Sequence, residues 1–157
     1  MPNWCDNSIY IEGENEVLKQ VWDECFTNDV LDFDKVIPYP EPYRSMDANS
    51  GFCGAGFNAG GYEWRVENWG TKWNADFDES DFSLEDGFIT GSCFTAWSPP
   101  LGVMMELSKK YPVRVVIEYD EAGMPFQGEI EYEDGVETVI YDRSGEDYVS
   151  NYEEEDD

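Results

Sequence analysis

Short runs of alternating apolar and polar residues recur along this chain, and stretches with helical spacing separate some of them. Residues 8–12 alternate in this way and end at Gly13, which predicts a short strand. Asn15 follows as a candidate N-cap for a helix. The apolar stripe of that helix consists of Val17, Leu18, Val21, Trp22 and Cys25. The chain is therefore predicted to begin with a strand followed by a helix.

The second half of the chain gives a clearer pattern. Residues 77–97 predict a β-hairpin with its turn at Asp86-Gly87, a pair that favours tight hairpin turns. Ser98 is then a candidate cap for a second helix, which Pro112 ends. The buried side of this helix is predicted to consist of Val103, Met104, Leu107 and Tyr111.

Three further strands are predicted beyond this helix. Residues 113–119 form the clearest strand pattern, and residues 126–133 and 136–141 predict a second hairpin around Asp134-Gly135. The resulting order matches a ferredoxin-like split βαβ topology with an extra C-terminal β-hairpin. The expected fold class is α+β, with a mainly antiparallel sheet and two helices on one face.

The domain is predicted to span residues 1–141, with a Trp- and Gly-rich insertion at about 32–75 packed on one end of the sheet. Within the insertion, residues 32–37 predict a short extended piece, and residues 62–73 predict a helical turn or two. Residues 142–157 are acidic and poor in apolar side chains, so we expect a disordered tail.

The net charge of the chain restricts the classes of partner it can bind more than any sequence motif does. It has 36 Asp and Glu against 9 Lys and Arg, with no His, and a formal net charge of −27. A compact chain of this length is ~40 Å across, and ~40 Å of duplex DNA carries roughly 23 charges, so the two match in charge density. Such a surface repels nucleic acid and membranes and attracts basic proteins. Solubility and adaptation to high salt are alternative explanations of equal weight.

Other features exclude several classes of protein. The chain starts without the basic and apolar segments of a signal peptide and has no ~20-residue apolar run, so a cytoplasmic protein is expected. Without His, Ser–His and Cys–His nucleophile pairs are impossible, and we expect no enzyme. Acidic residues 76–81 do not match a calcium-binding loop, so no metal or cofactor is expected. The isolated cysteines are predicted to be buried rather than disulfide-bonded, and they are Cys5, Cys25, Cys53 and Cys93.

Three segments carry a family resemblance: residues 1–7 (MPNWCDN), 69–75 (WGTKWNA) and 95–100 (TAWSPP). Together with Gly128 and the acidic strand around it, they resemble the YubB-like family of plasmid and phage proteins. The resemblance covers most of residues 1–135 and implies a ferredoxin-like domain and an origin on a mobile genetic element. It brings no catalytic residues.

Two groups of side chains are candidates for a binding site. The first is a row of carboxylates on one solvent face of the C-terminal strands, consisting of Glu118, Asp120, Glu129, Glu131, Glu133 and Glu137. The second is an aromatic and basic group that could form a ligand pocket or simply attach the insertion to the sheet. Its members are Trp64, Arg65, Trp69, Lys72, Trp73 and Trp97.

These features support three hypotheses. The first is a non-catalytic DNA-mimic inhibitor or anti-defence protein that binds a basic host protein, such as a nuclease, restriction, recombination or CRISPR-type effector. It would bind neither nucleic acid nor membrane. The second is a small-ligand-binding module that uses the Trp-rich insertion. The third is an oligomeric structural protein that associates through the exposed edge of the last hairpin, since the sequence leaves the oligomeric state open.

Overall fold

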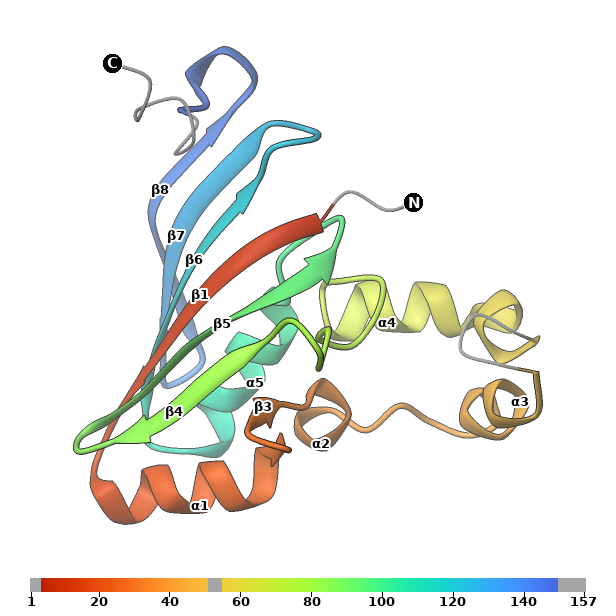
Figure 1. Ribbon diagram of the computed structural model, residues 1–157, viewed down its shortest axis with the longest axis horizontal. Helices are drawn as coiled ribbons and strands as arrows, with labels where there is room; N and C mark the ends of the chain where they lie inside the picture. The colour runs from red at the N-terminus through yellow and green to blue at the C-terminus, as the bar shows by residue number, and fades with distance from the viewer. Residues whose placement is uncertain (1–3, 51–54, 150–157) are drawn as a thin grey trace.

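One antiparallel sheet of six strands organises the protein (Figure 1), whose computed structural model describes residues 4–50 and 55–149. The strand order is β4-β5-β1-β6-β7-β8, so the N-terminal strand lies in the middle, between β5 and β6. The first four strands in this order form the ferredoxin-like sheet, and the β7–β8 hairpin extends it past β6. The predicted fold class is confirmed. The strands are β1 (Trp4–Glu12), β4 (Asp81–Glu85), β5 (Phe88–Ala96), β6 (Arg114–Glu121), β7 (Phe126–Glu133) and β8 (Val136–Ser144).

Helices α1 (Asn15–Cys25) and α5 (Leu101–Lys110) cover one face of this sheet (Figure 1). Both bury the apolar stripes that the sequence predicts, with Leu18 and Val21 fully buried on α1 and Leu107 fully buried on α5. Their partners on the sheet include Ile9, Ile11, Ile89, Val115 and Ile117, all almost completely buried. No helix of the described residues covers the opposite face of the sheet.

Both predicted helix caps are wrong. Asn15 is the first residue of α1, and its side chain bonds instead to the β4–β5 turn, with the Asp86 carboxylate at 2.7 Å and the Gly87 N–H at 2.8 Å. Helix α5 starts at Leu101 without a side-chain cap, and the Ser98 hydroxyl donates to the carbonyl of Gly70 at 2.7 Å. In both places, the side chain that the local sequence predicts as a helix cap instead forms hydrogen bonds with residues distant in the chain.

The predicted insertion contains more helix than expected. Residues 33–36, predicted as extended, form α2 (Phe33–Val36), and the Asp32 carboxylate caps it by accepting from the Asp34 N–H at 3.1 Å. The helical turns predicted within residues 62–73 are present as α4 (Tyr62–Asn68). The elements not predicted are the π-helical turn (Phe57–Gly61), the two-residue strands β2 (Phe26–Thr27) and β3 (Val30–Leu31), and the helix α3 (Tyr43–Ser50).

Ordered structure continues past the predicted domain end at residue 141. β8 runs to Ser144, and a 3₁₀ turn follows over Gly145–Asp147. This segment folds back on the sheet. The Tyr148 hydroxyl donates to Asp120, and the Gln127 side-chain amide donates to the carbonyl of Val149 and accepts from its N–H. The prediction of a disordered tail is therefore wrong for residues 142–147, and residues 150–157 lie outside the described part.

Two further expectations concern membranes and thiols. Among the helices of the described segments, none is long and apolar enough to cross a bilayer.

Cys5, Cys25 and Cys93 are buried free thiols, as predicted, and burial raises the pKa of Cys93 to about 12. Cys53 lies outside the described residues.

Candidate functional site

The helix-free face of the sheet gathers an excess of carboxylates. Side chains alternate between the two faces of each strand, and the antiparallel register places outward residues of neighbouring strands directly opposite one another. We call the following set the acidic face: Asp6, Glu12, Asp81, Glu85, Glu118, Asp120, Glu129, Glu131 and Glu133. The same face carries the cations Arg114 and Arg143, so carboxylates strongly predominate.

Like charges stand opposite each other at two places on this face. Glu118 on β6 is opposite Glu129 on β7, and Asp6 on β1 is opposite Asp120 on β6. Such pairs destabilise a sheet by several tenths of a kcal/mol, whereas opposite charges stabilise it by a similar amount. Burial, together with the charge of Asp120, raises the pKa of Asp6 above its usual range.

Some acidic-face carboxylates have partners within the protein, and others do not. Arg114 Nε donates to Glu131 at 2.5 Å, and this hydrogen bond lowers the pKa of Glu131. Asp120 accepts from the Tyr148 hydroxyl. Within residues 4–50 and 55–149, the side-chain carboxylates of Glu118, Glu129 and Glu133 make no hydrogen bond or ion pair.

Five of the six predicted carboxylates lie together on this face, and Glu137 does not. Glu137 is opposite Tyr132, whose side chain is buried on the helix side, and it accepts a hydrogen bond from the Tyr132 hydroxyl at 3.0 Å. The prediction that Glu137 lies in the same row of outward carboxylates is therefore wrong. The signal was present in the sequence, because a two-residue turn at Asp134-Gly135 pairs residue 132 with residue 137.

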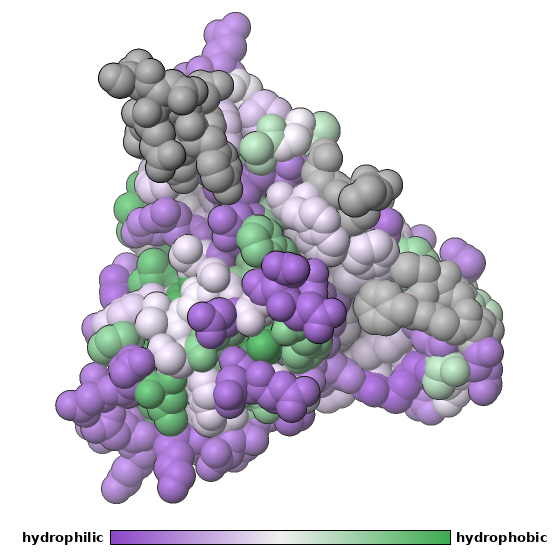
Figure 2. Space-filling view, in the orientation of Figure 1, coloured by the Kyte–Doolittle hydropathy of each residue, from purple (hydrophilic) through white to green (hydrophobic). Residues whose placement is uncertain are grey.

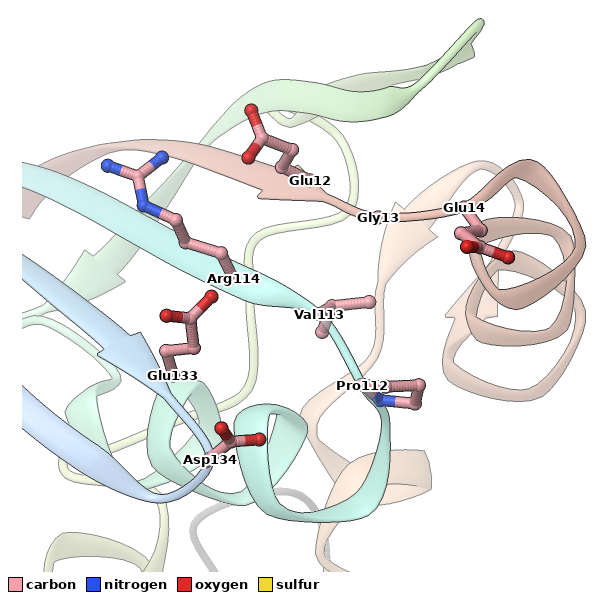
Figure 3. A pocket seen from close by; sticks show the side chains of 8 residues that line it. All are labelled: Glu12, Gly13, Glu14, Pro112, Val113, Arg114, Glu133 and Asp134. Atoms are coloured by element: carbon pink, nitrogen blue, oxygen red, sulfur yellow. The ribbon is translucent and has the colours of Figure 1, made fainter.

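A hollow of about 500 Å³ continues the acidic face where β1, β6 and β7 meet their connections to helices and turns (Figure 3). Its charged lining consists of Glu12, Glu14, Glu133 and Asp134 around the single cation Arg114. Figure 3 shows Arg114 between Glu12 and Glu133, whereas Glu14 lies at the start of α1. No cluster of metal-ligating side chains occurs in the described chain, so these carboxylates do not assemble a metal site.

Apolar side chains do not form one continuous area in the view of Figure 2. Hydrophilic residues dominate the lower margin, around α1, and hydrophobic residues appear as small separate patches. A stable complex driven mainly by apolar burial needs a larger contiguous patch than these. In this view, hydrophilic residues therefore predominate over hydrophobic ones.

The predicted aromatic and basic group divides into two clusters. In the first, Arg65 is only 2% exposed and pairs with Asp47 at 3.0 Å. Its guanidinium lies 4.3 Å from the ring centroid of Tyr39 and 6.0 Å from that of Trp69. Trp64 packs edge-on against Trp69, with ring centroids 5.6 Å apart. These residues attach the insertion to the core, which is the alternative that the sequence left open.

The second cluster surrounds Lys72 and is more accessible. The Lys72 ammonium lies 4.0 Å from the Trp97 ring centroid and 4.7 Å from that of Trp73. A hollow of about 320 Å³ lies beside it, bounded by Phe57, Tyr62, Lys72 and Trp97 among others. Trp97 is 44% exposed and has a φ of 73°, a conformation that a bulky residue adopts at an energetic cost.

The described parts of the three segments that carry the family resemblance, residues 4–7, 69–75 and 95–100, meet at one end of the sheet. The buried Asn7 amide donates to the carbonyl of Cys93 at 3.2 Å and to Thr95 Oγ1 at 2.9 Å. Thr71 in turn donates to the carbonyl of Ala96 at 3.0 Å. Sequence reasoning did not assign these polar residues a role. They hold the ends of β1 and β5 against the segment that follows α4.

A close backbone contact completes this junction. The backbone N–H of Gly102 donates to the carbonyl of Trp69 at 3.2 Å, and a Cβ added at Gly102 would lie 2.0 Å from the carbonyl oxygen of Asn68. Only glycine allows α5 to start this close to the end of α4. These segments therefore specify how the insertion joins the sheet.

Comparison with protein families identifies the class to which this architecture belongs. The family model described as "Ferredoxin-like domain in Api92-like protein" matches residues 69–157, which is more than half of the chain. The chain belongs to this family. The matched span includes β4 to β8, and with them most of the acidic face.

A solved structure extends the similarity of fold to nearly the whole chain. The crystal structure of protein Api92 from Yersinia pseudotuberculosis is similar with a TM-score of 0.58, covering 92% of this chain and 98% of that chain. The two sequences are 11% identical, so this likeness concerns the fold alone. No curated protein sequence matches the chain.

Proposed function

We propose that this protein is a non-catalytic inhibitor or adaptor that binds a basic partner protein through its acidic face. The observation that carries the proposal is the placement of like charges opposite each other, Glu118 with Glu129 and Asp6 with Asp120. These pairs weaken the sheet, and a sequence shaped by stability alone would alternate the signs. Binding a basic surface would relieve the repulsion and explain why the carboxylates are retained.

The spacing of the carboxylates supports a partner that normally handles nucleic acid. Alternate residues on one strand are ~6.6–6.8 Å apart, close to the spacing of phosphates along one DNA strand at ~7 Å. Glu129, Glu131 and Glu133 follow this repeat on β7. The hollow beside Glu133 adds a recess lined by carboxylates that can accept a Lys or Arg side chain.

The resemblance to the YubB-like family suggests the biological setting of this activity. An origin on a plasmid or phage fits a cytoplasmic protein that blocks a host nuclease, restriction enzyme, recombination protein or CRISPR-type effector. The negative charge supports a partner that is a protein rather than nucleic acid or membrane. The absence of His from the sequence supports a non-catalytic role.

Affinity capture from a host lysate at low and high salt tests this proposal. The wild-type chain is expected to retain a basic nucleic-acid-handling protein at low salt and to release most of it at high salt. The double variant Glu118→Gln/Glu129→Gln should retain at least tenfold less. Its matched control is Glu16→Gln/Asp23→Asn, which removes the same charge from the exposed surface of α1 and should retain wild-type amounts. Equal loss in both variants, or no basic protein captured by the wild type, would refute the proposal.

A second candidate function is binding of a small anionic aromatic ligand at the Lys72 cluster. The strained and exposed Trp97 favours it, because a residue held at φ 73° without a role would be replaced by glycine or asparagine. Nucleotides should then quench tryptophan fluorescence, and Lys72→Ala and Trp73→Ala should abolish the quenching. Lys19→Ala removes an exposed lysine from α1 and should leave it unchanged. A panel of nucleotides that leaves the fluorescence unaltered would remove this candidate.

A further inference from the structure

The two edge strands of the sheet differ in length and in how far other elements cover them. At one edge, β4 has five residues and lies near α1 and β3. At the other edge, β8 has nine residues, of which eight are exposed. An edge strand presents unpaired backbone N–H and C=O groups, so a long open edge is a template for a further strand.

The exposed apolar side chains of β8 favour association with another chain at this edge. Val136 is 62% exposed, and Val139 and Ile140 are each 51% exposed. The strand contains neither Pro nor Lys, which commonly protect edges from pairing. Its irregularity is a bulge, where Ile140 falls between the residues that face Glu129 and Ile130 of β7.

The charge around this edge selects the strand that could pair with it. On the outward face of the β7–β8 hairpin, the acids Glu129, Glu131 and Glu133 outnumber the cation Arg143. An added strand would lie ~4.8 Å from β8 and ~9.6 Å from β7, close enough for long basic side chains to approach these carboxylates. A second copy of the chain would instead bring together two molecules of charge −27.

We propose that an extended segment of the basic partner, with alternating basic and apolar residues, pairs with β8 as a seventh strand of the sheet. This inference rests on the proposed function, and it adds where and how the partner binds. Backbone hydrogen bonds to β8 provide affinity, and the outward carboxylates of β7 select for basic side chains. Apolar residues of the segment cover Val139 and Ile140.

A peptide probe separates strand pairing from simple charge attraction. The probe is a labelled nine-residue peptide of alternating Lys and Val, and its control is the same peptide N-methylated at every backbone nitrogen, which keeps the charge but leaves no N–H donor on either edge. With the full chain, fluorescence anisotropy should give at least tenfold tighter binding for the unmethylated peptide. Binding should also slow amide hydrogen exchange along residues 136–144. Equal affinity for both peptides would overturn the inference.

A substitution in β8 gives opposite expectations for the two modes of binding. Val139→Asp adds a negative charge but removes an apolar contact at the edge, so it should weaken peptide binding at least threefold. Val66→Asp on α4 adds the same charge to an exposed site far along the chain and should leave the affinity within twofold of wild type. Tighter binding by Val139→Asp would show charge attraction alone and overturn the inference. Unfolding curves of both variants check that the fold is kept, because both positions are exposed.

The failure of this inference can be distinguished from the failure of the proposed function. If both peptides bind equally while Glu118→Gln/Glu129→Gln weakens capture of the partner, the edge inference is wrong and the proposed function stands. If the acidic-face variant captures the partner normally but N-methylation still prevents peptide binding, the proposed function is wrong and the edge site stands. A stable dimer in light scattering that Val139→Asp dissociates would identify a second copy as the occupant and overturn the inference.

Discussion

Reversing one charge in the Glu118–Glu129 pair should stabilise the protein while weakening its binding to a basic partner. The two residues are directly opposite on β6 and β7, where Cβ atoms are ~5 Å apart. Two unit charges at this distance repel by ~0.8 kcal/mol in water and by ~3 kcal/mol at an effective dielectric constant of 20. Glu118 is exposed, so the lower value applies.

Glu129→Lys replaces this repulsion by attraction, so we expect a gain of about 1–2 kcal/mol in the free energy of unfolding. For a chain of this size the gain corresponds to a rise in Tm of about 2–8 °C. Urea and thermal unfolding at low salt measure it, and 1 M salt should remove most of it through screening.

Glu133→Lys provides the matched control. It changes the net charge by the same amount on the same strand, but Glu133 is opposite Arg114. This variant should lose up to about 1 kcal/mol of stability, because it creates a like-charged pair. If the two variants change the stability in the same direction by the same amount, local pairing does not matter, and the reasoning about the acidic face fails.

Three further predictions follow from the buried pair, the raised pKa and the C-terminal residues. Arg65→Met should cost about 3–5 kcal/mol in urea unfolding, because it leaves Asp47 buried without its cation; a loss below 1 kcal/mol would contradict this. Because the folded-state pKa of Asp6 is raised, the group favours the folded state most fully at acid pH, and that contribution is lost as the pH rises through this pKa. Asp120→Asn should lower the pKa of Asp6 in an NMR titration, though burial keeps it above its usual range. Deleting residues 150–157 removes five acids and no base, so association with a basic partner should slow at low salt while dissociation stays unchanged; loss of binding at every salt concentration would place recognition in these residues.

Local patterns predicted most of the sheet, because tight turns and alternation act over a few residues. The Asp86-Gly87 and Asp134-Gly135 turns and the strand pattern of 113–119 gave the main strands and the fold class. The helix at residues 33–36 had a readable signal as well, since Asp32 immediately precedes it. A helix of four residues is too short for the periodicity of its apolar residues to be recognised.

Long-range contacts account for what the sequence did not predict. Whether Asn15 and Ser98 cap their helices depends on the β4–β5 turn and on Gly70, which are distant in the chain. The burial of Arg65 depends on Asp47, and no local pattern relates a basic residue to an acid 18 positions away. The extension of β8 past residue 141 likewise depends on side-chain contacts across the sheet.

The central position of β1 has a consequence for how the chain folds. β1 is synthesised long before its two neighbours, β5 and β6, and the hydrogen bond from Asn7 to Cys93 spans 86 residues. Closing such long loops is slow, so β1 stays unpaired until most of the chain has left the ribosome. During this interval an unpaired apolar strand is prone to association with other nascent chains. The first half of the chain already carries many more acids than bases, and the resulting repulsion between unfinished copies opposes this association.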